Sequence, residues 1–273
     1  MTTAPHRWVR VSRQNPCPTC RHPDWCGISA NGELVCCMRI QSDRPARNGG
    51  WIHRLVEPLP QLPPPPAAAR DEIDAPALMA RWQHDHTTPE QVAGHAADLG
   101  VAPDALRRLG MAWAPPHRAW AFPMRNECER TVGIRLRAED GRKWAVRGSH
   151  SGLFIPQGLA GGRPVLICEG PTDTAAALTL GCDAVGRPSC EGNVATLTAW
   201  LCRRHCDEVV ILADHDAPGL RGAQKLAAVL PCAHRIAIPP CKDIREWLRL
   251  GATHDDVSAL IASCQLTTGG KNQ

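Results

Sequence analysis

The chain has 273 residues, of which 43% are hydrophobic and 21% charged, so it can bury a sizeable core and is long enough for about two domains. No apolar run approaches the roughly 18 residues of a membrane span, and the N-terminus lacks the apolar stretch of a secretory signal, so we expect a cytoplasmic protein without a membrane partner. The net charge of +4 permits a polyanionic partner without requiring one.

Cysteines are concentrated in one short stretch, NPCPTCRHPDWCGISANGELVCCMRI, near the N-terminus. It begins with a Cys-x-x-Cys pair, and its Asn-Gly step predicts a hairpin that brings the adjacent Cys36 and Cys37 back beside that pair. Because neighbouring residues of a strand point to opposite faces, the two are not expected to bind the same ion. We predict a structural zinc site made by Cys17, Cys20, Cys26 and Cys37, with His22 or Cys36 as substitutes.

Proline is dense in residues 57–76, EPLPQLPPPPAAARDEIDAP, which excludes helix interiors and central strands. We predict a semi-rigid linker here. It separates a small zinc-ribbon-like β module, residues 1–56, from a larger globular part.

The next segment, residues 77–161, is predicted to begin with helices, with Thr88-Pro89-Glu90 as a cap and first turn. It then alternates apolar and basic residues: Ile134 and its i±2 neighbours Val132 and Leu136 lie on one face, and Arg135 and Arg137 lie on the other. This predicts a basic α+β subdomain that gathers Arg125, Arg135, Arg137, Arg142, Lys143 and Arg147. Such a face is either a solvated surface or a binding site for phosphate-bearing substrates.

Short apolar strands alternate with amphipathic helices through residues 162–251, before a C-terminal helix and tail at 252–273. This alternation predicts an α/β domain with a parallel sheet flanked by helices. Ligands of such sheets bind at the carboxyl ends of the strands.

Carboxylates follow three of these strands. Glu169 ends the first strand, Asp214 and Asp216 follow the third, and Asp243 follows the fourth. Crowded carboxylates repel one another unless cations lie among them, and hard oxygen ligands favour Mg²⁺ or Mn²⁺. We therefore predict a divalent metal site at this edge.

The stretches ICEGPTD, LADHDAPG and CKDIREW resemble the three signatures of the Toprim domain. The preceding FPMRNECERTVGIRLR and KWAVRGSHSGLF resemble the basic β subdomain of DnaG-type primases, which also carry an N-terminal zinc module. The resemblance covers nearly the whole chain. The glycine pair and asparagine usual in the bacterial basic subdomain are missing, and the zinc motif contains only cysteines and an extra Trp25-Cys26. These departures indicate a phage, plasmid or mobile-element branch.

The resemblance implies a DNA primase that makes short RNA primers on single-stranded DNA by two-metal nucleotidyl transfer. It makes Asp214, Asp216 and Asp243 ligands of Mg²⁺ or Mn²⁺, and Glu169 a ligand or the general base. The residues expected to bind nucleic acid or nucleoside triphosphates are Arg125, Arg135, Arg137, Lys143, Arg147 and Lys242. Arg245 would reach a phosphate or remain a helix-surface charge, and Trp25 would stack on a base or pack against the zinc hairpin.

Two other functions are compatible with the same motifs: a Toprim-type metal-dependent nuclease, and a catalytically silent nucleic-acid-binding regulator of replication. The residues after Asp243 are too few for a fused helicase, and no Walker-type loop occurs in the sequence. We therefore expect a separate replicative helicase as a partner.

Overall fold

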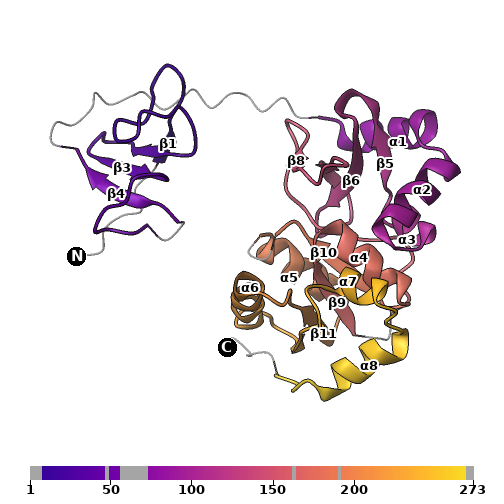
Figure 1. Cartoon of the computed structure of the whole chain (residues 1–273). Coiled ribbons are helices and arrows are strands. Elements are labelled where there is room, and N and C mark those ends of the chain that lie inside the picture. The colour runs from indigo at the N-terminus through magenta and orange to yellow at the C-terminus, as the bar shows by residue number, and fades with distance from the viewer. Residues whose placement is uncertain (1–7, 47–48, 56–72, 162–163, 190–191, 269–273) are drawn as a thin grey trace. The chain divides into compact units, whose positions relative to one another are not determined.

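The structure is a computed structural model that describes residues 8–46, 49–55, 73–161, 164–189 and 192–268 (Figure 1). The chain divides into two compact units, Met1–Arg70 and Asp71–Gln273. Their boundary falls within the predicted linker, of which residues 57–72 lie outside the described part. The predicted end of the linker is wrong, because helix α1 (Ala75–His86) already includes Ala75 and Pro76. Proline is compatible with a first helical turn, where its missing N–H has no intrahelical partner.

The first unit contains one small antiparallel sheet in the order β1-β2-β3-β4. Its strands are β1 (Trp8–Arg10), β2 (Gly27–Ser29), β3 (Leu34–Cys37) and β4 (Trp51–Arg54). The predicted hairpin is confirmed: β2 pairs with β3, and the Gly32 N–H donates to the Ser29 carbonyl oxygen at 2.8 Å. Three of the six buried core residues are cysteines, and the apolar ones are only Val11, Ile28 and Val35.

The second unit begins with three helices and a second antiparallel sheet. The helices are α1, α2 (Pro89–Leu99) and α3 (Pro103–Arg108), and the sheet has the order β5 (Ala112–Ala114), β6 (Ala119–Arg125), β7 (Thr131–Arg137), β8 (Lys143–Ala145). The predicted cap of α2 is confirmed. Thr88 and Gln91 form a capping box, in which each side chain accepts the other's backbone N–H, at 3.3 and 2.9 Å.

The predicted parallel sheet is also confirmed, with the strand order β10-β9-β11-β12. Its strands are β9 (Val165–Glu169), β10 (Ala184–Arg187), β11 (Glu208–Leu212) and β12 (Ala233–Ala237). The helices that follow them are α4 (Gly170–Thr179), α5 (Val194–Arg203), α6 (Ala217–Ala227) and α7 (Ile244–Arg249), before α8 (His254–Ser263). None of the described helices is long and apolar enough to cross a membrane.

One hydrophobic core joins the antiparallel sheet to the parallel sheet. Trp120, Phe122 and Met124 of β6 lie in the same buried cluster as Leu166 of β9 and Ala176 of α4. The other face of the parallel sheet has its own cluster, which includes residues of α5 and α6. Because one core is continuous across the two sheets, the basic strands are held in a fixed position beside the carboxyl edge of the parallel sheet.

A buried histidine in this core should make folding depend on pH. His95 is 9% exposed, stacks on Trp120 at 4.5 Å between ring centroids, and has a buried Nε2 without a hydrogen-bond partner. Burial, aided by the charge of Arg137 and opposed by that of Asp98, lowers the pKa of His95 from 6.5 to about 4. Between about pH 6.5 and pH 4 the unfolded chain binds a proton at His95 that the folded protein does not bind. The free energy of unfolding therefore falls as the pH is lowered through this range.

We expect His95 to lower the free energy of unfolding by about 2 kcal/mol between pH 7 and pH 5. Urea denaturation at both pH values checks this, with His95→Leu as the comparison because leucine cannot titrate. The loss on acidification should be smaller in His95→Leu by that amount. Equal losses in the two proteins would show that His95 does not control this pH dependence.

Candidate active site

Glu169 lies at the carboxyl end of β9, as predicted, and is half-buried. The next residue, Gly170, has φ +81° and begins α4. Residues with a Cβ rarely adopt this left-handed backbone, so glycine allows the chain to turn from strand into helix immediately after the carboxylate. The Glu-Gly pair therefore places an acidic side chain at the edge of the sheet.

The loop after β11 carries Asp214 and Asp216. Asp216 caps α6, and its Oδ1 accepts the Gly219 N–H at 2.7 Å. A Cβ on Gly219 would lie 2.7 Å from the Asp214 carbonyl oxygen, so only glycine allows this close turn. The His215 N–H donates to the Lys242 carbonyl oxygen at 2.8 Å, which ties this loop to the one after β12.

Asp243 follows β12 and is 7% exposed. Its Oδ1 accepts the Glu246 N–H at 2.7 Å as the N-cap of α7. Asp216 and Asp243 each use Oδ1 for a helix cap, so neither cap requires the second carboxylate oxygen. The caps fix the orientation of both carboxylates.

Asp173 belongs to the same group, although the sequence analysis did not select it. It lies in the first turn of α4, four residues after Glu169, and its Oδ1 is buried without a hydrogen-bond partner. Burial raises its pKa to about 7, with Asp243 and Asp214 adding to the shift and Arg245 and Lys143 opposing it. The sequence signal was ambiguous, because an aspartate in a first turn is also favoured by the helix dipole.

The carboxylates act on one another electrostatically. Burial and then the charges of Glu169, Asp243 and Asp216 raise the pKa of Asp214 to about 6. These carboxylates do not form a tight cage: among the described residues, only the four cysteines bring three or more potential ligand atoms within 4.8 Å of one another. The orphaned Asp173 Oδ1 together with an all-oxygen donor set fits a divalent cation such as Mg²⁺.

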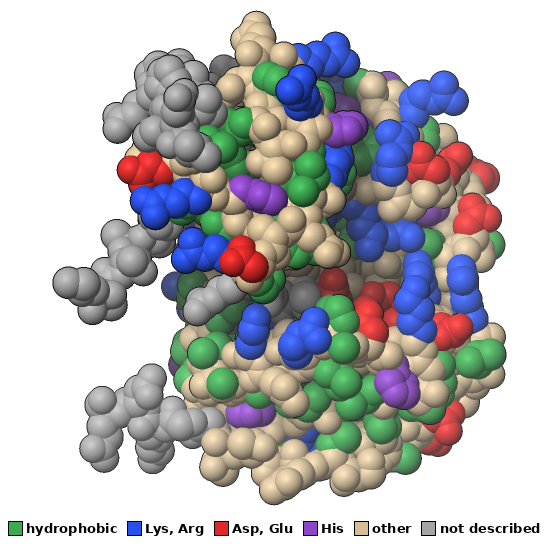
Figure 2. Space-filling view, turned by 60° about the vertical axis from the view of Figure 1, so that its left-hand side comes forward, with side chains coloured by type: hydrophobic (Ala, Val, Ile, Leu, Met, Phe, Trp, Pro, Cys, Tyr) green, Lys and Arg blue, Asp and Glu red, His purple; other side chains and the backbone are tan. Residues whose placement is uncertain are grey.

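Three of the predicted basic residues lie near these carboxylates. Arg137, at the end of β7, is half-buried; burial and then Arg245 lower its pKa, whereas Asp173 opposes that shift. The exposed Lys143 and Lys242 oppose the upward pKa shifts of Asp173 and Asp214, respectively. Figure 2 shows Lys and Arg side chains beside Asp and Glu side chains on one face of the molecule.

The other predicted basic residues have different surroundings. Arg125 donates to the Glu129 carbonyl oxygen at 3.5 Å in the turn after β6, and burial lowers its pKa. Arg135 is half-buried on β7, two residues before Arg137, and Arg147 is exposed after β8. Arg142 pairs with Asp140 at 2.7 Å.

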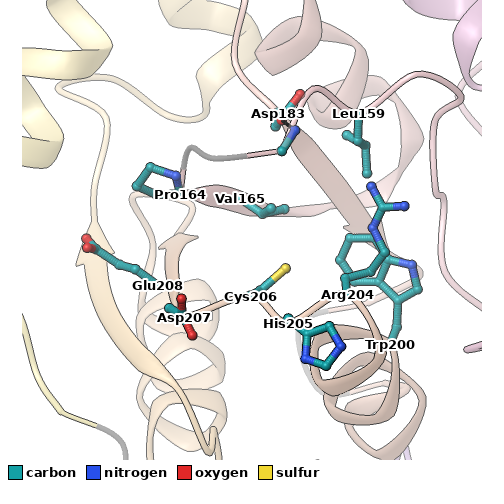
Figure 3. A pocket seen from close by; sticks show the side chains of 11 residues that line it. Leu159, Pro164, Val165, Asp183, Trp200, Arg204, His205, Cys206, Asp207 and Glu208 are labelled. Carbon is teal, nitrogen blue, oxygen red and sulfur yellow. Dashed lines mark hydrogen bonds between the residues drawn. The ribbon is translucent and has the colours of Figure 1, made fainter.

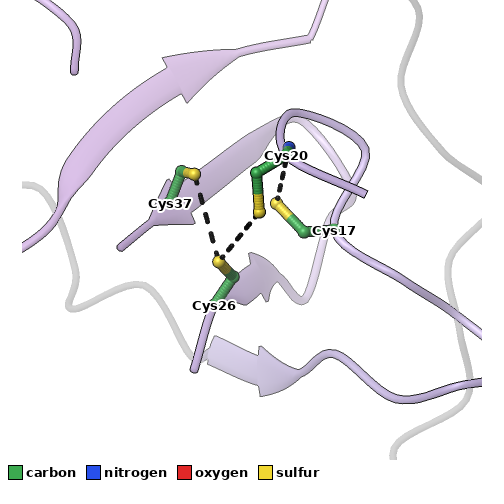
Figure 4. A group of neighbouring side chains, drawn as sticks. All are labelled: Cys17, Cys20, Cys26 and Cys37. Carbon is green, nitrogen blue, oxygen red and sulfur yellow. Dashed lines mark hydrogen bonds between the residues drawn. The ribbon is translucent and has the colours of Figure 1, made fainter. Parts of the chain in front are cut away.

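The four cysteines chosen from the sequence converge in the small unit (Figure 4). Their sulfur atoms lie within 4.8 Å of one another, with Cys20–Cys26 at 3.7 Å and Cys26–Cys37 at 4.0 Å. A tetrahedral ion with Zn–S bonds of about 2.3 Å would separate its sulfur ligands by about 3.8 Å. Backbone N–H groups of Met38 and Ile40 donate to Cys26 and Cys37, at 3.4 and 3.3 Å. The arrangement fits a zinc ion.

The substitute ligands lie outside this group. Cys36 is buried outside the group of four cysteines, beside Gly50: a Cβ added to Gly50 would lie 3.0 Å from the Cys36 sulfur. His22 is exposed. Burial raises the pKa of Cys20, but the His22 N–H and the neighbouring thiols outweigh it, and the pKa is lowered to about 7. A thiolate at Cys20, the form that binds a metal, is therefore accessible near neutral pH.

Trp25 does not pack against the zinc hairpin: its side chain is 69% exposed. Its φ of +65° is unusual for a bulky residue. The preceding Asp24 is held by an ion pair with Arg39 at 2.6 Å, and the following residue is Cys26. The fold therefore presents this indole to solvent, next to the zinc-site residue Cys26.

A separate cavity of about 340 Å³ lies at the opposite ends of the strands (Figure 3). It is lined by residues before β9 and β11, and the carboxylate of Asp183 at its wall accepts the N–H groups of Ala160 and Gly161 at 3.2 and 3.0 Å. None of the carboxylates of the candidate site borders it. It is therefore not part of that site.

Comparison with known proteins agrees with the fold. The family described as Toprim-like matches residues 166–248, whereas no curated protein is significantly similar in sequence. The E. coli primase catalytic core superposes with a TM-score of 0.56 at 16% identity, covering 70% of this chain and 79% of that chain. The Aquifex aeolicus primase, with its zinc-binding and RNA polymerase domains, gives 0.58 at 13% identity, covering 71% and 60%.

A third structure, a DnaG primase catalytic domain bound to single-stranded DNA, gives a TM-score of 0.54 at 14% identity over 70% of this chain and 78% of that chain. At identities this low, the superpositions establish the fold alone. The chain therefore carries a Toprim-like domain at residues 166–248, within the fold of the DnaG-type primase catalytic core.

Proposed function

We propose that this protein is a DNA primase, which synthesises short RNA primers on single-stranded DNA from nucleoside triphosphates. The observation that carries the proposal is a group of carboxylates at the carboxyl edge of the parallel sheet, which we call the acidic edge: Glu169, Asp173, Asp214, Asp216 and Asp243. These carboxylates influence one another's charge, and Arg137 and Lys143 of the antiparallel sheet act on the same group. Nucleotidyl transfer needs carboxylates that bind divalent metal ions and, beside them, basic side chains that bind phosphates.

Asp214, Asp216 and Asp243 would hold two Mg²⁺ or Mn²⁺ ions, with Glu169 as a further ligand or the general base. Such ions stabilise the negative charge of phosphoryl oxygens during in-line displacement. Glu169, if it acts as the base, would accept the proton of the primer 3′-hydroxyl. Asp173, whose buried Oδ1 has no hydrogen-bond partner, would add negative charge beside these ligands.

Nucleic acid would lie on the basic side of this edge, where Arg125, Arg135, Arg137, Lys143, Arg147 and Lys242 are the candidate contacts. The zinc module, with Trp25 exposed, would contact the template and take part in choosing the start site. The DnaG catalytic domain that was solved with single-stranded DNA supports this class of template. We further propose that the protein acts in the cytoplasm, comes from a phage or mobile element, and works with a separate helicase.

Primer synthesis on random single-stranded templates tests the proposal. The protein, labelled nucleoside triphosphates and Mg²⁺ or Mn²⁺ should yield short RNA products that depend on the template. Cleavage of the template without any nucleotide would instead identify a nuclease. Binding without either product would identify a silent regulator.

Removing two basic side chains should weaken phosphate contacts specifically. We expect Arg137→Ala with Lys143→Ala to weaken the binding of single-stranded DNA or nucleotide. The salt dependence of DNA affinity should flatten by roughly 0.7 in logarithmic slope for each lost phosphate contact. Fluorescence anisotropy across a salt series measures this effect.

The control, Arg107→Ala with Arg203→Ala, removes the same charge from two exposed positions. It should change the slope much less. If the two double variants behave alike, or if neither differs from the wild type, the basic strand is only a solvated face.

A further inference from the structure

We infer that Glu246 of α7 is a positioning residue for the acidic edge. Its side chain holds the backbone of Lys242, and it thereby fixes the turn that carries Asp243 against the loop that carries Asp214 and Asp216. The inference deepens the proposed function and rests on it only for the reaction that the acidic edge carries out.

Two reciprocal side-chain contacts hold the start of α7. The Asp243 Oδ1 accepts the Glu246 N–H at 2.7 Å, and the Glu246 Oε2 accepts the Lys242 N–H at 2.8 Å. This arrangement resembles a capping box, but the returning side chain reaches the residue before the N-cap instead of the N-cap itself. Because the acceptors are carboxylates, both hydrogen bonds are stronger than bonds between neutral groups. Glu246 therefore restrains the backbone immediately before a carboxylate of the acidic edge.

The backbone of Lys242 also meets the neighbouring loop. Its carbonyl oxygen accepts the N–H of His215, the residue between Asp214 and Asp216, at 2.8 Å. The strands β11 and β12 are adjacent, and the N–H of Ala213 donates to the carbonyl oxygen of Ala237 at 3.0 Å just where both strands end. Both backbone polar groups of Lys242 are thus engaged, one by Glu246 and the other by the loop of the two aspartates.

The helix itself is anchored by other residues. Ile244 is 3% exposed in the core, and Trp247 and Leu248 pack against the same cluster, whereas Glu246 is exposed. Loss of the Glu246 side chain should therefore leave α7 in place and loosen only the turn before it. Removing an outer contact that orients metal ligands typically costs about 10–100-fold in metal affinity or activity.

The first test compares Glu246→Ala with Glu246→Gln in the full chain and needs neither metal nor nucleotide. Glutamine loses the charge but keeps a carbonyl oxygen that can accept the Lys242 N–H. We expect the His215 amide to exchange its hydrogen about tenfold faster in Glu246→Ala, because the acceptor of that amide is held less firmly. NMR measures this rate, which should stay near the wild-type value in Glu246→Gln. The melting temperature of either variant should fall by no more than about 4 °C.

The second test measures Mn²⁺ affinity by titration and primer synthesis by steady-state kinetics. Glu246→Ala should weaken Mn²⁺ binding and lower kcat by about tenfold, with a much smaller change in KM for nucleoside triphosphates. Glu90→Ala is the matched control, because Glu90 is exposed in the first turn of α2, as Glu246 is in the first turn of α7. It removes the same side chain, charge and favourable interaction with a helix dipole. The control should resemble the wild type in all these measurements.

Three results would overturn the inference. The first is a folded Glu246→Ala that matches Glu90→Ala in His215 exchange, Mn²⁺ affinity and kcat. The second is faster exchange without any loss of Mn²⁺ affinity or kcat, which would make the contact merely structural. The third is a Glu246→Gln as impaired as Glu246→Ala, because the charge and not the hydrogen bond would then matter.

Failure of the inference and failure of the proposed function are separable. A wild-type protein that makes no primers, while Glu246→Ala exchanges the His215 amide faster and binds Mn²⁺ more weakly, would reject the function and keep the positioning role. Active wild type together with an unchanged Glu246→Ala would keep the function and reject the positioning role.

Discussion

Replacing Asp214 or Asp216 with asparagine should abolish primer synthesis and leave the protein folded. Neutralising Asp214 removes a charge that its acidic neighbours and burial already disfavour, so stability should stay the same or rise. Asparagine is as good an N-cap as aspartate, so Asp216→Asn should also preserve the start of α6. We expect activity to fall by roughly 100-fold or more, as when one electrostatic contact to a transition state is lost.

Primer synthesis and thermal melting of the same preparations measure the two effects. Asp255→Asn is the control, because Asp255 is an exposed residue at the start of α8 and outside the acidic edge. It should retain both activity and melting temperature. Full activity in well-folded Asp216→Asn would refute two-metal primase chemistry at this edge.

Glu169→Gln should lose activity as well, and metal affinity then separates its two possible roles. Titration with Mn²⁺ should show weaker binding if Glu169 is a ligand. Nearly unchanged binding would assign it to proton transfer. If these carboxylates were only structural, melting temperature would fall and activity would decline in proportion to the folded fraction.

Removing zinc should unfold residues 15–40 and leave the larger unit folded. The buried apolar residues of the small core are Val11, Ile28 and Val35, with Met38 and Leu55 half-buried against them, so burial alone contributes little and the metal–thiolate bonds dominate. Structural zinc binding contributes on the order of 10–16 kcal/mol in comparably small modules. Chelation, or Cys17→Ser, should therefore expose the small unit to proteolysis while the thermal transition of the second unit is retained.

Elemental analysis of purified variants tests the ligand set. Cys17→Ser should lose zinc, whereas His22→Gln and Cys36→Ser should keep it, because neither residue belongs to the group of four sulfur atoms. Loss of zinc in His22→Gln would change the ligand assignment. Protein without tightly bound zinc, in which Cys17→Ser changes nothing, would reject the zinc site altogether.

The sequence by itself determined the features that depend on local patterns. Alternating apolar strands and amphipathic helices predicted the parallel sheet, because these periodicities follow directly from backbone geometry. The positions of Glu169, Asp214 and Asp243 relative to strand ends placed them at one edge, since parallel strands end together. The opposite directions of Cys36 and Cys37 on one strand predicted that only one of the two binds the ion, and the structure places Cys37 in the group of four.

Other features were decided only by contacts between distant segments. The core shared by Trp120 and Ala176 joins the two sheets, and no local pattern specifies which apolar faces meet. That packing separates Arg137, beside the acidic edge, from Arg125, which bonds to Glu129. It also buries Asp173, which in the sequence looks like an ordinary first-turn aspartate. Charge and hydrogen-bond environment depend on the whole tertiary structure, so the same residue types acquired different roles only when the chain was folded.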